Sequence, residues 1–145
     1  MKSKKLWKRV LYYGSLIIAI IVIQMIIKIG MEGMWLLGIP KAENVTSVTI
    51  KYPSLAEENL EITDNEQIEL CVNLSGFLKY KLFVDGDAKD RPLITFYYHL
   101  KNGDQVEVSA NNIAVFYNGK RHILKDDNSF VKFVEVLFYQ EYFVE

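Results

Sequence analysis

The sequence predicts an α+β protein: an N-terminal transmembrane helix followed by a two-layer domain, an antiparallel sheet with two helices on one face. Three observations support this expectation. Residues 10–27 contain no charged side chain, and beyond residue 41 several short segments alternate apolar and polar residues between turn signals. Two further segments, at 63–77 and 126–145, repeat their apolar residues with helical spacing. We expect the order β(β)-α-β-β-β-β-α in the domain.

The apolar N-terminal segment predicts a membrane anchor. A transmembrane helix needs roughly 20 mostly apolar residues, and the segment extends from residue 10 to residue 30 once Lys28 extends its amine to the surface. The run is too long for the core of a cleaved signal peptide and no cleavage site follows it, so we expect a signal-anchor. The alternative is a buried core helix. The expected division is a basic cytoplasmic tail (1–9), a transmembrane helix (10–30), a juxtamembrane linker (31–43) and an extracytoplasmic α+β domain (44–145).

The charge distribution predicts the orientation of this anchor. Residues 1–30 carry six basic side chains and no acidic one, and five of the six precede the span: Lys2, Lys4, Lys5, Lys8 and Arg9. The positive-inside rule therefore places the N-terminus in the cytoplasm and the domain outside the plasma membrane. The remaining residues hold 11 basic and 18 acidic side chains, a net charge of −7. A nucleic-acid-binding body would need the opposite sign, so we expect no nucleic-acid partner.

The first part of the domain predicts a strand and a helix. Residues 45–52 alternate apolar and polar side chains, and residues 60–62 suit a second, short strand. Thr63 and Glu66 fit a capping box that starts a helix. Its inward stripe is expected to hold Ile68, Cys71, Val72 and Ser75, widened by Leu70, Leu74 and Phe77. Cys71, the single cysteine, can form no intrachain disulfide, and its place on this stripe favours a core residue over a nucleophile.

The acidic segment 85–92 is a candidate for a calcium-binding loop. Asp85, Asp87 and Asp90 lie within six residues, but an EF-hand loop needs glycine at its sixth position and an acid at its twelfth. Asp90 and Phe96 occupy those positions, so we expect a solvated turn.

A meander of four strands should follow, at 93–100, 105–110, 113–117 and 120–124, joined by turns at Asn102-Gly103, Asn111-Asn112 and Asn118-Gly119. The last helix is expected at 126–145, capped by Asp126, Asp127 and Asn128. Its apolar face should hold Phe130, Phe133, Val134, Leu137 and Phe138. This order of elements resembles the topology of a single repeat of the TATA-binding-protein fold, a likeness that implies nothing about DNA.

The candidate site is the sheet face that the helices leave uncovered. If the helices pack on the face of Phe96 and Tyr98, a possible partner-binding surface would hold Thr95, Tyr97, His99, Glu107 and Phe116, with Thr49, Lys51, Gln105 and Ser109 beside them. The alternative is an ordinary solvated face. His99 and His122 have no metal ligand at a suitable spacing, and no phosphate loop, nucleophile elbow or catalytic carboxylate pair is present. We therefore expect no catalytic or metal residue, no cofactor and no enzymatic activity.

Several short stretches resemble a known family. They are Ile39 to Val45, Ser47 to Ile50, Pro92 to Thr95, Val108 to Asn111 and Asn118 to Lys120 with His122. Together they resemble a small extracytoplasmic domain of unknown function of Gram-positive bacterial membrane proteins. That domain also occurs appended to membrane metallopeptidases of the penicillin-sensing antirepressor type. This chain has no His-Glu-x-x-His motif, so the resemblance implies a location and a fold and no activity.

The sequence thus favours a single-pass membrane-anchored binding or sensing domain of unknown ligand. The expected partners are the lipid bilayer and a protein or cell-envelope ligand on the outer side. An accessory or scaffold subunit, docked in a larger membrane complex through its transmembrane helix, is the alternative, and an enzyme is the third class.

Overall fold

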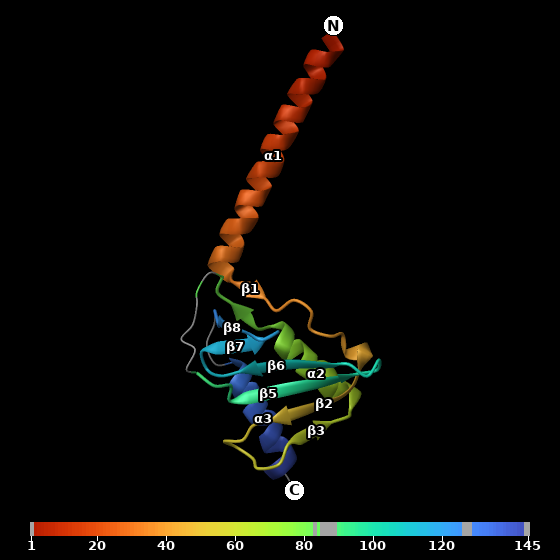
Figure 1. Cartoon of the computed structure of the whole chain (residues 1–145), viewed down its shortest axis with the longest axis vertical. Coiled ribbons are helices and arrows are strands. Elements are labelled where there is room, and N and C mark those ends of the chain that lie inside the picture. Colours follow the sequence, from red (N-terminus) through yellow and green to blue (C-terminus); the bar gives the residue numbers. More distant parts are fainter. Residues whose placement is uncertain (1, 83, 85–89, 126–128, 144–145) are drawn as a thin grey trace.

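The computed structural model describes residues 2–82, 84, 90–125 and 129–143, and it shows a long N-terminal helix joined to an α+β body (Figure 1). The long helix α1 comprises Lys2–Glu32. It is long and apolar enough to cross a membrane, with a mean hydropathy of 2.4 over its most apolar window, and no residue of that window is buried against the body. The expected fold class is therefore confirmed at the level of an apolar N-terminal helix and a mostly antiparallel sheet domain.

The main sheet of the body has six antiparallel strands in the order β3-β2-β5-β6-β7-β8. Their bounds are β2 Val45–Lys51, β3 Leu60–Ile62, β5 Ile94–Leu100, β6 Gln105–Ala110, β7 Ala114–Tyr117 and β8 Lys120–Ile123. A short 3-10 helix, η1 at Ala42–Asn44, leads into β2. A separate ribbon pairs β1 (Met34–Trp35) with β4 (Lys79–Tyr80), and its strands are too short for an alternating pattern to predict.

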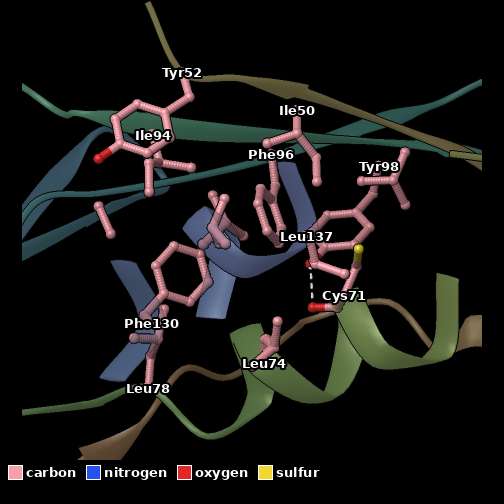
Figure 2. Close-up of a cluster of buried hydrophobic side chains, with 14 of the residues drawn as sticks. Ile50, Tyr52, Cys71, Leu74, Leu78, Ile94, Phe96, Tyr98, Phe130 and Leu137 are labelled. Carbon is pink, nitrogen blue, oxygen red and sulfur yellow. Dashed lines mark hydrogen bonds between the residues drawn. The ribbon is translucent and has the colours of Figure 1, made fainter. Parts of the chain in front are cut away.

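Helices α2 (Asn65–Gly76) and α3 (Ser129–Phe143) cover the same face of this sheet, as Figure 2 shows. From α3, the ring of Phe130 lies 5.1 Å from the ring of Phe96 in β5, centroid to centroid. From α2, Ser75 contacts Tyr98, two residues further along the same strand and therefore on the same face. At the end of β2, the hydroxyl of Tyr52 donates a 2.8 Å hydrogen bond to Glu135 of α3. The hydrophobic core is thus a single layer between the sheet and both helices.

The expected stripes of the two helices need correction. The side chain that caps α2 is Asp64, not Thr63, because one carboxylate oxygen of Asp64 accepts hydrogen bonds from the backbone N–H groups of Glu66 and Gln67. Leu70 and Phe77, expected to face the core, are exposed. In α3 the buried face includes Val131, whereas Phe133 is exposed. The stripe of α2 is therefore narrower than expected, and that of α3 is rotated so that Val131 replaces Phe133.

The two hairpin turns differ in their backbone. Asn118 and Gly119 both have positive φ, 49° and 70°, as a two-residue type I′ turn requires. The Asn102-Gly103 turn between β5 and β6 was expected to have positive φ at both residues. A turn forms there, but only Gly103 has positive φ, at 89°. A register shift near the start of β2 lets both Val45 and Val48 face the core. Most of the acidic segment, 85–89, and the expected caps 126–128 lie outside the described residues.

Candidate functional site

The outer face of the sheet is the face opposite α2 and α3, and the strand register brings the five candidate residues together on it. Tyr97 of β5 pairs with Glu107 of β6, while Thr95 pairs with Ser109, which in turn pairs with Phe116 of β7. His99 lies on the same face as Tyr97 because side chains two residues apart in a strand share a face. The structure therefore shows these residues side by side.

One hollow on this face surrounds Tyr97 and His99. The amine of Lys51 lies 4.8 Å from the centroid of the Tyr97 ring, a cation–π distance. The hydroxyl of Thr49 is 2.9 Å from Nε2 of His99, so the imidazole is oriented by the neighbouring strand. These four residues and Gln105 line a shallow hollow of about 270 Å³. It offers an aromatic face, a cation and an imidazole on one open surface.

The middle of the outer face holds a small polar cluster. Ser109 is almost fully buried, and its hydroxyl lies 3.0 Å from the Thr95 hydroxyl and 3.1 Å from the Glu107 carboxylate. The contact between Ser109 and Thr95 connects β6 with β5 through side chains as well as through the backbone. The hydroxyl oxygen of Thr95 accepts this hydrogen bond, so Thr95 contributes to the structure of the cluster.

Beyond this cluster, Arg121 of β8 joins the candidate residues. It pairs with Phe116 across the hairpin, and its guanidinium forms an ion pair with Asp90. The Arg121 side chain is only 12% exposed, and its Nε and Nη1 atoms have no hydrogen-bond partner among the described residues. Sequence reasoning missed this residue, although the hairpin turn at Asn118-Gly119 places it opposite Phe116.

A larger groove follows the outer edge of the β6–β7–β8 region. It measures about 640 Å³, and its charged and aromatic lining is provided by Glu107, Phe116, Lys120 and Arg121. Side chains of opposite charge on one groove suit a zwitterionic or peptide-like ligand better than a simple ion. Gly38, from the segment after α1, also lines it.

A further hollow of about 380 Å³ lies at the β8 edge of the sheet. There the rings of Tyr80 and His122 stack with their centroids 4.3 Å apart. Burial, and then the charge of Lys120, lower the pKa of His122, so the neutral imidazole is favoured. A neutral ring packs against Tyr80 without the desolvation cost of an ion.

The described residues include His, Cys, Asp and Glu side chains, which are the usual ligands of metal ions in proteins. No group of three or more His, Cys, Asp or Glu side chains lies close enough there to hold a metal ion. Cys71 is fully buried on the helix side of the sheet, away from the outer face, and burial raises the pKa of its thiol to about 12. A protonated, inaccessible thiol is a poor nucleophile.

Comparison with known proteins does not assign this site. No family model matches the chain, and neither the curated proteins nor the solved structures provide a match to it.

Proposed function

We propose that the protein is a single-pass membrane protein that presents a non-enzymatic binding or sensing domain outside the plasma membrane, and that the outer sheet face is its binding surface. One observation carries the proposal. The hydrophobic core lies between the sheet and the helices on the other face, yet the outer face presents the half-buried rings of Tyr97 and Phe116 beside Glu107. Aromatic side chains with charges at their rim are typical of recognition surfaces.

The location is part of the same proposal. Five basic residues before the apolar span support a cytoplasmic N-terminus and an outer body. The stretches that resemble an extracytoplasmic domain of Gram-positive bacteria support the same location. They include Val108 to Asn111 in β6 and the Asn118-Gly119 turn. We also propose that the body shares the topology of a single TATA-binding-protein repeat. This likeness concerns the fold and implies no function.

A second candidate is an accessory or scaffold subunit that docks in a larger membrane complex through α1. The observation that favours it is that no residue of the apolar window of α1 is buried against the body, so the helix surface is free for a partner. Gly14 has no other group within 4 Å of its Cβ position, which would allow a close helix–helix approach there.

Site-specific photo-cross-linking in cells tests these two functions. A photoreactive phenylalanine analogue replaces Tyr97 or Phe116 on the outer face or, as the matched control, the exposed Phe133 of α3. We expect a discrete adduct from positions 97 and 116 and none from position 133. The adduct should persist when α1 is exchanged for an unrelated transmembrane helix, and Glu107→Lys should weaken it.

The scaffold function makes the opposite prediction. If the adduct disappears with the exchange of α1, the helix is what recruits the partner. If position 133 gives the same adduct as position 97, the outer face has no special role and our proposal is wrong.

A further inference from the structure

The β1–β4 ribbon has one buried side and one exposed side. Trp35 pairs with Lys79, and the backbone N–H of Leu36 donates a 3.4 Å hydrogen bond to the carbonyl of Leu78. Trp35 and Lys79 therefore share one side of the ribbon. Leu37 and Phe77 flank the ribbon, next to the residues joined by this hydrogen bond, and Phe77 is the C-terminal cap of α2.

The residues of this region differ strongly in burial. Leu36 and Leu78 are buried in the core, at 6% and 7% exposure. Trp35, Leu37 and Phe77 are 50%, 67% and 77% exposed, and we call these three residues the apolar ribbon patch. Three large exposed apolar side chains at and beside the ribbon are typical of an interaction site.

The connection to α1 fixes where this patch lies. α1 ends at Glu32 and β1 begins at Met34, so only Gly33 separates them. Gly33 is tightly packed, with φ at +80° and a Cβ position only 2.9 Å from the carbonyl oxygen of Tyr80. Figure 1 shows α1 entering the body directly at β1. No flexible linker separates the end of the helix from the ribbon.

The distance from the apolar span to Trp35 is short. If the span ends near Gly30, two helical residues and three extended ones cover at most about 13 Å. The polar headgroup layer on each side of a bilayer is itself roughly 5–8 Å thick. The patch is therefore held within or beside that layer, where tryptophan is enriched in membrane proteins.

Three lysines lie at the same end of the body as the patch. The amine of Lys79 lies 4.6 Å from the centroid of the Trp35 ring. Backbone hydrogen bonds place Lys125 beside Lys79 and Lys81 beside Ile123, so two more lysines belong to the same end of the body. Amines next to an aromatic and aliphatic patch complement a phospholipid surface, where they meet phosphate groups above the acyl chains.

We propose that the apolar ribbon patch inserts into the headgroup layer of the bilayer that α1 crosses, so that the body is held against the membrane in one orientation. This inference rests on the membrane anchor in the proposed function. It does not depend on the ligand of the outer face. The ribbon would then act as a second, interfacial anchor. The β8 end of the sheet would lie near the lipid, and the β3 end away from it (Figure 1).

Tryptophan fluorescence of the full chain, reconstituted at one chain per nanodisc in anionic phospholipid, tests this. The protein has two tryptophans, Trp7 and Trp35, so Trp7→Phe leaves Trp35 as the single reporter and Trp35→Phe leaves Trp7. Lipids brominated in the upper part of their acyl chains should quench Trp35, and aqueous acrylamide should quench it less than in the urea-unfolded chain. Leu37→Ser with Phe77→Ser should reduce the quenching by bromine, whereas Phe133→Ser, a matched change on α3, should leave it unchanged.

The Trp7 reporter distinguishes failure of the membrane anchor from failure of the docking of the ribbon. If bromine quenches Trp7 but not Trp35, the helix is inserted and the docking of the ribbon is wrong. If it quenches neither, the membrane anchor fails and the ribbon proposal fails with it. Each disc holds one copy of the chain, and the scaffold belt of the disc is the only other protein present. If the patch is instead a contact site for a second copy or for a protein partner, Trp35 will remain open to acrylamide in the disc, which also contradicts the inference.

Discussion

The hydroxyl of Tyr98 donates a 2.7 Å hydrogen bond to the backbone carbonyl of Cys71, which joins the middle of β5 to the middle of α2 (Figure 2). The same hydroxyl lies 2.5 Å from the hydroxyl of Ser75, one helical turn further on. Tyr98 and Ser75 are both fully buried, and burial raises the pKa of Tyr98 above its ordinary value. A neutral phenol thus sets the position of α2 on the sheet.

Removal of this hydroxyl should destabilise the body. Tyr98→Phe leaves the buried Ser75 hydroxyl without its phenol partner, and an unsatisfied buried polar group costs about 1–3 kcal/mol. Urea unfolding of the full chain in detergent, followed by circular dichroism, measures the loss. The matched control is Tyr97→Phe, at the next residue but on the outer face, where we expect a change within about 0.5 kcal/mol. Equal effects of the two substitutions would contradict this account of how α2 is held.

Cys71 should make stability depend on pH in the alkaline range. Its thiol has a pKa of about 12 in the folded protein, against an ordinary value of 9.0. The folded state therefore binds this proton more tightly, so the contribution is complete below pH 9 and is lost as the pH rises toward 12. Between pH 9 and pH 10 the loss amounts to about 1 kcal/mol.

Urea unfolding at pH 8, 9 and 10 measures this loss. The interval ends where the ordinary pKa of tyrosine, 10.0, would add the titration of Tyr98. In Cys71→Ala most of the pH-dependent loss should disappear, and the smaller remainder near pH 10 comes from Tyr98 and Tyr52, whose pKa values are also raised. A small cavity should lower the stability of this variant by about 1 kcal/mol at every pH. Rapid labelling of native Cys71 by a membrane-impermeant thiol reagent would show that the side chain is exposed and would overturn the prediction.

The segment before β2 should contribute to the stability of the isolated body. The sequence suggests that residues from about 41 onward fold alone, but Leu36 lies in the core and Ile39 packs against it. A body that begins at Met34 should therefore be more stable than one that begins at Lys41, by about 2–4 kcal/mol for the burial of Leu36. Thermal unfolding of the two fragments measures the difference. In the longer fragment, Leu36→Ala should reproduce most of this difference in stability. Leu37→Ala, at an exposed position, should change the stability very little. Two fragments of equal stability would exclude Leu36 from a structural role.

The charge bias around α1 predicts the topology of the protein in the membrane. Protease added to intact protoplasts should remove the body and leave a tag at the N-terminus intact, because Lys2, Lys4, Lys5, Lys8 and Arg9 retain that end in the cytoplasm. Replacement of these five residues by glutamine should produce a population with the body protected. Full protection of the body in the parent protein would reverse the orientation and place the outer sheet face in the cytoplasm.

Local signals were sufficient for most of the secondary structure. The alternation in Gln105 to Ala110 predicts β6 with the bounds that the structure shows, because Val106, Val108 and Ala110 pack in or against the core while Gln105 and Glu107 are exposed. The same alternation assigns Thr95, Tyr97 and His99 to one face of β5. The buried faces of the two helices were predicted less well. Leu70 and Phe133 are as apolar as their buried neighbours and differ from them only in what lies opposite them in the fold.

The sequence by itself determined the apolar N-terminal helix, the antiparallel strands and the faces on which their side chains lie, because each of these depends on a period or a turn within a few residues. Only the tertiary structure decided which distant segments meet. Trp35 and Lys79 pair across 44 positions of the chain, and Arg121 reaches Asp90 across 31. Such contacts depend on how the core closes around Leu36, Leu78 and Tyr98, and no local pattern encodes that closure.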